Sequence, residues 1–395
     1  FTQNGTGTSS LAGDITTTDN NISFLRAVTL TGPVAMTIGA GGGNITFSSA
    51  VDATTAAAET LSLTAGTGNI TFSGLVGSTT TLGAVTIVSA ADVTTNGLRA
   101  ASFTQTAGTG TTTINTGAFS TTPQGMATTA SDGVVINNDA ITVNDSIHTT
   151  GGGVVTLTTD NGLLTMAADG DVFADGAVEL TGSTGIKTAG NITTTNDDVT
   201  FKSATTLTGN VVIETGTGAG TVAFNSTLDG TTAATETLEI TAGTGNITFT
   251  GLVGATRTLG AVRVNNAQNV TVNGLRAASF IQTTGTGATT INTGAFASTP
   301  QGMATTAYAG VSIQNASITV NDSIDTVGSG RVTLNATDAT TGILTLAADG
   351  DIGADGAVQL TGAAGIENAS DITTTNDNVT FVSATTLMGA VDINT

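Results

Sequence analysis

AETLSLTAGTGNITFSGLVG, from Ala58 to Gly77, returns almost unchanged as TETLEITAGTGNITFTGLVG, from Thr235 to Gly254, at an offset of 177 residues. Within each stretch, apolar residues alternate with Thr, Ser or Asn over short runs such as NITF, and Gly follows most of these runs. Alternation of this kind is typical of short β-strands that are separated by tight turns. The stretch therefore predicts a β structure in which one element is used repeatedly.

Further segments return at the same offset, so the repeat covers most of the chain. They are NGLRAASF from Asn96 and Asn273, PQGMATTA from Pro123 and Pro300, and ITVNDSI from Ile141 and Ile318. Three extra residues in the second copy, between the equivalents of Leu157 and Gly162, raise the offset to 180 for AADGD at Ala167 and Ala347. An insertion of this kind is expected in a loop.

The copy boundaries follow from DITTTDNNISF at Asp14, which recurs in similar form at Asn191 and Asp371. We predict one continuous solenoid with the end of a preceding copy at residues 1–13 and the start of a third copy at residues 371–395. The two complete copies cover residues 14–190 and 191–370. The sequence thus reads as a part of a longer repetitive chain.

A shorter period lies inside each copy, where pieces such as VTIVS, SFTQT, VVINN and VVTLTT are separated by Gly, Asn and Asp. Cutting at these joints gives about eight coils per copy of 177–180 residues, or roughly 22 residues per coil, a length that suits solenoid repeats. The predicted fold is all-β, a right-handed parallel β-helix (β-solenoid). Ile, Val, Leu, Phe and Ala are expected to face inward, and Thr to face outward.

Composition agrees with a thin core and restricts the function. The 395 residues include 53 Gly and 3 Pro but no Trp and no Cys, and the net charge is −21. Immunoglobulin-like sandwiches would repeat near 100 residues and bury a large aromatic anchor, and neither feature is seen. Nucleic acid is not expected as a partner because phosphate binding needs a basic surface, and no apolar stretch is long enough to span a membrane.

Short runs of alternating apolar and polar residues are repeated, as in LTAGTGNITFSG (from Leu63), LGAVTIVSAADVTTNGL (from Leu82) and the segments similar to DITTTNDDVTF. In these runs the chain resembles the β-strand-repeat proteins of bacterial surfaces. These are the filamentous-haemagglutinin-like and autotransporter-like adhesins with parallel β-helix stalks. The resemblance covers the whole chain and implies export, great length and attachment to cells or surfaces. It implies nothing about a binding partner, because no catalytic or ligand motif carries it.

Crowded carboxylates in AADGDVFADGA and AADGDIGADGA are the sharpest candidates for a site. Oxygen-rich, glycine-rich loops suit calcium, although the spacing matches a helix-loop-helix calcium loop only in part. The alternative is that these carboxylates are solvated groups in turns. The candidate metal ligands are Asp169, Asp171, Asp175, Asp349, Asp351 and Asp355.

Other polar positions are expected to be structural. Asn144, Asp145 and Ser146 predict a hydrogen-bonded corner more than an ion site. The recurring Arg99 and Arg276 are expected to bind corner carbonyls or a carboxylate, with ligand binding as the alternative. The recurring phenylalanines are expected to stack in the core, and they are Phe24, Phe47, Phe72 and Phe103, with copies at Phe201, Phe224, Phe249 and Phe280.

We expect a structural protein of the cell surface or extracellular space, such as a filament or stalk, and not an enzyme. Its expected partners are neighbouring copies or flanking repeats of the same protein, and surface carbohydrate. A carbohydrate-binding or polysaccharide-cleaving β-helix is the alternative, but the single histidine, His148, is replaced by Asp325 in the second copy. An ice-binding threonine face is disfavoured because coils of roughly 14 to 31 residues look too irregular for one flat face.

Overall fold

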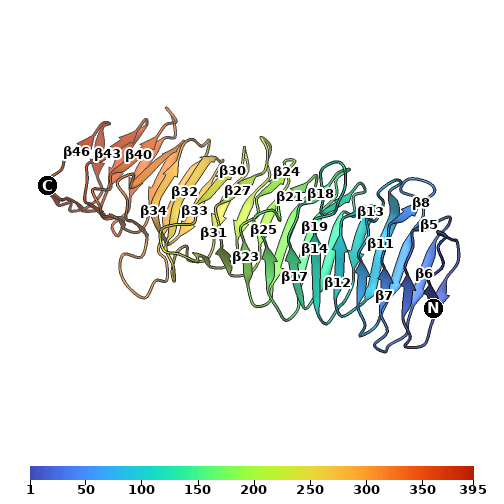
Figure 1. Cartoon of the computed structure of the whole chain (residues 1–395). Helices are drawn as coiled ribbons and strands as arrows, with labels where there is room; N and C mark the ends of the chain where they lie inside the picture. Colours follow the sequence, from blue (N-terminus) through green and yellow to red (C-terminus); the bar gives the residue numbers. More distant parts are fainter. The chain divides into compact units, whose positions relative to one another are not determined.

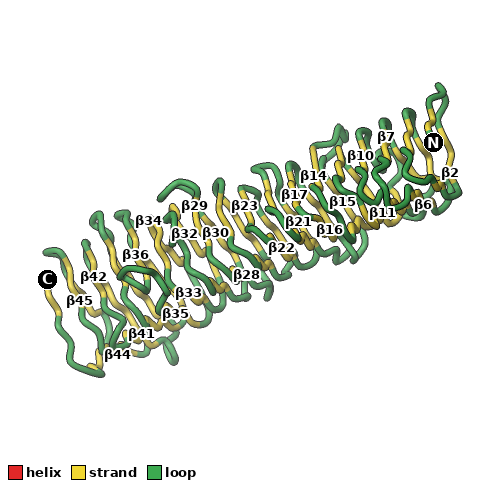
Figure 2. Tube along the Cα trace, turned by 90° about the horizontal axis from the view of Figure 1, so that it is seen from below, coloured by secondary structure: helices red, strands yellow, loops and turns green.

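The computed structural model describes residues 1–395, and it contains β-strands and no helix (Figures 1 and 2). The strands are parallel and stack as a β-solenoid of about 17 coils with about 23 residues each. The prediction of an all-β parallel solenoid is confirmed. No helix is present that could cross a membrane. The chain folds into two compact units, Phe1–Thr194 and Thr195–Thr395.

In the first unit, successive coils build three parallel sheets. Sheet I contains β1 (Thr2–Gln3), β4 (Ile22–Phe24), β7 (Ile45–Phe47), β10 (Ile70–Phe72), β12 (Val93–Asn96), β14 (Thr111–Asn115), β17 (Ala140–Val143), β20 (Leu164–Met166) and β23 (Ile186–Thr188). Sheet II contains β2 (Ser9–Leu11), β5 (Val28–Leu30), β8 (Val51–Ala53), β15 (Met126–Thr128), β18 (Ile147–Thr149), β21 (Val172–Ala174) and β24 (Ile192–Thr194). Sheet III contains β3 (Ile15–Thr16), β6 (Val34–Thr37), β9 (Leu61–Thr64), β11 (Leu82–Ser89), β13 (Leu98–Gln105), β16 (Val134–Asn138), β19 (Val155–Thr159) and β22 (Val178–Gly182).

Sheet II has no separate strand between β8 and β15. One coil contributes only Val76, which bridges Val51 and Leu98 without forming a strand. In the next coil, β13 serves two sheets, because its Leu98 end pairs with β15 and its Phe103 end pairs with β16. A coil therefore does not need three separate strands to keep the three sheets continuous.

The second unit has the same construction. Sheet IV contains β25 (Val199–Phe201), β28 (Val222–Phe224), β31 (Ile247–Phe249), β33 (Val270–Asn273), β35 (Ala288–Asn292), β38 (Ser317–Val320), β41 (Ile343–Leu346), β44 (Gly365–Asn368) and β47 (Thr385–Leu387). Sheet V contains β26 (Thr205–Leu207), β29 (Leu228–Gly230), the bridging residue Val253, the Leu275 end of β34, β36 (Met303–Thr305), β39 (Ile324–Thr326), β42 (Ile352–Ala354), β45 (Ile372–Thr374) and β48 (Ile393–Asn394). Sheet VI contains β27 (Val211–Glu214), β30 (Leu238–Thr241), β32 (Leu259–Asn266), β34 (Leu275–Gln282), β37 (Val311–Asn315), β40 (Val332–Ala336), β43 (Val358–Gly362) and β46 (Val379–Phe381).

Phenylalanine side chains stack along the core of each unit. Phe47 lies between Phe24 and Phe72, with ring centroids 5.4 and 5.2 Å apart and planes within 3° of parallel. Phe224 lies between Phe201 and Phe249 in the same way. These rings are buried, and neighbouring coils present them in register because the flanking strand residues pair one to one. The prediction of stacked core aromatics is confirmed for these six residues.

Corner residues with short polar side chains join adjacent coils. Asp19 has a φ of 58°, a left-handed conformation that Asp and Asn tolerate better than other non-glycine residues. Its Oδ1 accepts a hydrogen bond of 2.7 Å from the backbone N–H of Gly41, one coil further on. In the second unit, Asn196 has a φ of 65° and accepts the N–H of Gly218 at 2.6 Å. The predicted turn chemistry therefore also holds the coils together.

A polar network is buried inside the first unit. Asn138 is fully buried, and its Oδ1 accepts the N–H groups of Gly110 and Asp139 at 3.2 and 2.8 Å. Its Nδ2 donates to the carbonyl of Ala91 and to Oγ1 of Thr112 at 3.2 and 2.9 Å. One side chain thus joins three coils, and Asn315 makes the corresponding contacts in the second unit.

Candidate functional site

The outer face of sheet I carries a column of threonines at the strand centres. Each one lies between two buried side chains, so its own side chain points outward. Consecutive members pair directly with each other, although the chain between them ranges from 19 to 29 residues. The loops take up the variation in coil length, so irregular coil lengths do not by themselves prevent a regular threonine column. The column comprises Thr46, Thr71, Thr94, Thr113, Thr142 and Thr165.

Asparagine side chains form a ladder beside this column. Nδ2 of Asn144 donates to Oδ1 of Asn115 at 2.8 Å, and Nδ2 of Asn115 donates to Oδ1 of Asn96 at 3.1 Å. Asp145 accepts hydrogen bonds from the N–H and hydroxyl of Ser146. These contacts confirm the hydrogen-bonded corner that was predicted at residues 144–146. The second unit has an equivalent ladder of Asn273, Asn292 and Asn321.

Arg99 holds a loop that leaves the solenoid between β14 and β15. Its Nη2 donates to the carbonyl and hydroxyl oxygens of Thr121 at 2.7 and 2.9 Å, and to the carbonyl of Pro123 at 3.2 Å. The guanidinium carbon lies 3.9 Å from the centroid of the Phe119 ring, within cation–π distance. Planar donors suit both contacts at once. We call residues 116–125 the clamped loop of the first unit.

Arg276 clamps the equivalent loop of the second unit, residues 293–302. Its Nη2 donates to the carbonyl and hydroxyl of Ser298 at 2.6 and 3.1 Å and to the carbonyl of Pro300 at 3.3 Å, and it lies 4.0 Å from the Phe296 ring centroid. The predicted role of the two arginines, binding carbonyl groups, is confirmed. Each Nη2 makes its hydrogen bonds within the protein, whereas the buried Nε of each arginine has no hydrogen-bond partner.

A glycine makes room for each aromatic ring. Gly97 has a φ of +93°, and a Cβ atom there would lie 2.8 Å from Cε2 of Phe119. Gly274, with a φ of +88°, has the same relation to Phe296. The glycine and the arginine of NGLRAASF thus both contact the clamped loop. The glycine leaves space for the phenylalanine ring, and the arginine places its guanidinium over that ring.

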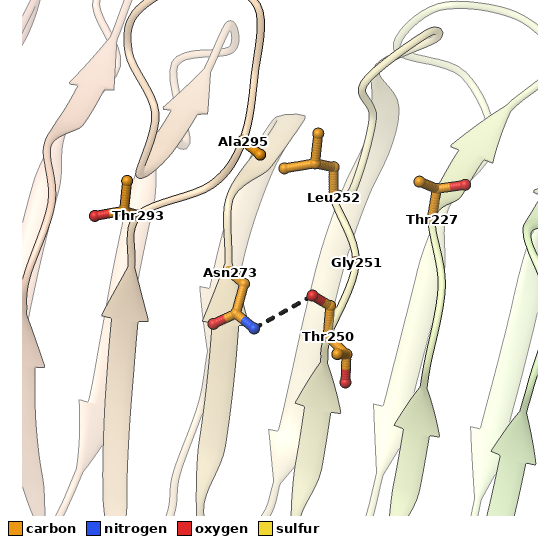
Figure 3. Close-up of a pocket in the computed structure, with 7 residues that line it drawn as sticks. All are labelled: Thr227, Thr250, Gly251, Leu252, Asn273, Thr293 and Ala295. Carbon is orange, nitrogen blue, oxygen red and sulfur yellow. Dashed lines mark hydrogen bonds between the residues drawn. The ribbon is translucent and has the colours of Figure 1, made fainter.

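An open groove of about 570 Å³ lies beside the clamped loop of the second unit (Figure 3). The amide of Asn273 on its floor donates to the carbonyl of Thr250 at 3.3 Å. The partly exposed Leu252 offers the only bulky apolar side chain of the lining. The lining residues are Thr227, Thr250, Gly251, Leu252, Asn273, Thr293 and Ala295.

Replacing Arg99 by Ala is expected to free the clamped loop without unfolding the solenoid, because the three hydrogen bonds and the ring contact are local. Limited chymotrypsin digestion should then cleave after Phe119 about tenfold faster or more, equivalent to about 1.4 kcal/mol of lost local stability. Arg26→Ala is the control, since Arg26 is exposed. Equal cleavage of the two variants would contradict the clamp.

The six predicted calcium ligands do not converge. No group of three or more His, Asp or Glu side chains anywhere in the chain is placed to hold a metal ion. Asp171 accepts the N–H of Asn191, and Asp175 accepts the N–H of Gly152. Asp351 and Asp355 accept the N–H groups of Asp371 and Ser329. Asp169 and Asp349 are exposed in turns. Calcium binding stays a prediction, and four of the six carboxylates have a structural role.

The same outer position differs between the copies. In the first unit, the His148 ring lies 4.3 Å from the exposed Phe173 ring, and burial lowers the pKa of His148 against the opposing charges of Asp145 and Asp171. In the second unit, Asp325 occupies the equivalent place, beside Gly353. Burial, followed by the charges of Asp351 and Asp322, raises the pKa of Asp325 although a Ser323 hydrogen bond lowers it.

A shallow acidic groove surrounds Asp325 in the second unit. It is lined by Ser323, Asp325, Asp351, Ile352, Gly353, Asp371 and Thr373. Asp351 and Asp371 each accept a backbone N–H of the following coil at 2.8 Å. These carboxylates therefore form a ladder along the coils, and they do not pair with a base.

The sequence arguments missed two features, one on an outer face and one in the interior. Phe173 is outward-facing, but its neighbours Val172 and Ala174 are buried, so its spacing alone could have shown this. Asn138 was not singled out, because nothing in VVINN distinguishes a buried amide from an exposed one except the alternation from Val134.

Comparison with protein-family models, with curated proteins and with solved structures gives no match to this chain.

Proposed function

We propose that the chain is a structural segment of an extracellular or cell-surface protein, a spacer built from tandem solenoid copies. One observation carries the proposal: in each unit the parallel backbone ladder continues from coil to coil in all three sheets. Backbone hydrogen bonds then run along the direction in which the coils stack. Such a structure lengthens by adding copies, without any change to the contacts within each coil.

The side chains support the same function. Several polar groups that could recognise a ligand instead bind a neighbouring coil or loop, as Arg99, Arg276 and the asparagine ladders do. The chain has no Cys, so stability comes from the ladder and the core. The tandem copies are part of this proposal. So is a right-handed coil, because the crossover between parallel β-strands is right-handed for steric reasons.

Electron microscopy of the purified full-length protein tests the proposal. We expect elongated particles whose length increases in proportion to the number of copies when one copy is deleted or added. Compact particles, or a length that does not change with copy number, would contradict a spacer function.

Carbohydrate binding is the second candidate, and the groove beside Leu252 favours it. Thr and Asn side chains flank one apolar group there, a combination that suits a sugar ring. A panel of immobilised polysaccharides tests it, with Leu252→Asp as the blocking variant. Retention that Leu252→Asp abolishes would support a carbohydrate site, and uniform absence of retention would reject it.

A further inference from the structure

We infer that one sequence copy advances seven and two-thirds coils, so that each surface feature recurs in the next copy on the preceding sheet, a third of a circuit short of its earlier position. The inference does not depend on the proposed function. It makes the prediction of about eight coils per copy more exact. It also decides what kind of lateral partner a longer array of copies fits.

The second unit shows the shift because it contains the starts of two copies. Val199, in NITTTNDDVTF, lies on sheet IV, whereas its copy Val379, in DITTTNDNVTF, lies on sheet VI and pairs with Val358. Eight full coils along sheet IV lead from Val199 to Thr385, not to Val379. The next copy therefore begins one strand before the eighth coil is complete.

The next strand of the copy shifts in the same direction. Thr205, in ATTLTG, lies on sheet V, and its copy Thr385, in ATTLMG, lies on sheet IV beside Ile366. Two consecutive strands thus move to the preceding sheet together. A local irregularity at one strand would not produce this.

The first unit gives the same result with different residues. Ile15, in DITTTDNNISF, pairs with Met36 on sheet III. Its copy Ile192, in NITTTNDDVTF, pairs with Val172 on sheet II. The copies here are 177 residues apart, and those in the second unit are 180 apart. Because the three added residues lie in a loop, both lengths give the same shift.

The fold tolerates the shift because all three sheets make the same demand on a strand. Each strand needs alternating inward apolar and outward polar residues, and β25 and β46 both have the pattern of V-T-F. A strand can therefore move to another sheet and keep its inward and outward faces.

The shift limits the partners that an array can bind. A given feature, such as the threonine column or the clamped loop, returns to the same side only after three copies. That is 23 coils, or about 110 Å at the usual strand spacing. A flat lattice such as ice or crystalline polysaccharide meets one copy in three. The surface therefore fits partners that bind within a single copy.

Cysteine cross-linking tests the shift directly, and the protein has no native Cys to interfere. Gln359 and Thr380 are strand partners across sheet VI, so Q359C/T380C should form an oxidative cross-link. E367C/T386C is the positive control, because Glu367 and Thr386 are partners in sheet IV. E367C/T380C has the pairing that a copy of eight whole coils would require.

We expect cross-link yields for Q359C/T380C and E367C/T386C that exceed that of E367C/T380C by about tenfold or more, since disulfides need closely placed Cα atoms. Thermal melting of the reduced variants checks that each is folded. A higher yield for E367C/T380C than for Q359C/T380C would overturn the inference. Failure of both expected pairs in folded protein would overturn the strand register on which it rests.

Discussion

Replacing Phe47 by Ala is expected to lower the free energy of unfolding by about 3 to 5 kcal/mol. Phe47 is fully buried and is stacked on both sides, by Phe24 and Phe72. The cavity left by the ring cannot close, because strands β4, β7 and β10 are fixed to one another by the backbone ladder. Both the burial of the ring and its two ring contacts are lost.

Chemical denaturation followed by circular dichroism measures the effect, and hydrogen exchange at Ile45–Phe47 locates it. Phe224→Ala is the matched variant in the second unit and should behave alike. Phe173→Ala is the control, because that ring is 39% exposed and points outward, and its cost should be about 1 kcal/mol or less. Equal losses for Phe47→Ala and Phe173→Ala would contradict the assignment of the core.

Replacing Asn138 by Ala is expected to cost about 3 kcal/mol or more, since each buried polar group left without a partner costs about 1 to 3 kcal/mol. The N–H groups of Gly110 and Asp139, the carbonyl of Ala91 and the hydroxyl of Thr112 would all lose a hydrogen bond. A smaller apolar side chain cannot replace any of them. The loss should appear as faster hydrogen exchange over three adjacent coils.

Asn137→Ala is the matched control for this variant. Asn137 is the adjacent residue of the same type, and its buried Oδ1 has no hydrogen-bond partner. Its replacement removes no hydrogen bond of that oxygen and should lower the unfolding free energy by no more than about 0.5 kcal/mol. A similar loss for the two variants would show that the network around Asn138 does not stabilise the fold.

The sequence predicts the class of fold well because the alternation is strict. In V-T-F and I-T-F runs the inward positions are apolar and the centre is polar, so the parallel strands and the stacked Phe47 and Phe72 could be expected. The recurrence of Arg99 within NGLRAASF predicts a structural contact, and the hydrogen bonds to Thr121 and Pro123 confirm it. These features depend on local pattern and on repetition.

The missing third of a coil per copy could not be predicted in this way. Cuts at glycine-rich joints assume that every joint separates comparable pieces, whereas one coil has only Val76 in sheet II and β13 continues through two sheets. The contacts of Asp351 and Asp371 also depend on which residues become neighbours one coil later. Spacing along the chain does not determine these neighbours when the loops differ in length.

The parallel ladder also determines how the chain responds to tension. A pull on one end of the backbone acts on the outermost coil first, since each coil pairs only with its two neighbours. Detaching one coil of about 23 residues releases roughly 80 Å of extended chain, and the coil beneath keeps its own hydrogen bonds. The solenoid therefore yields under load one coil at a time, and it lengthens many times over before its last coil opens.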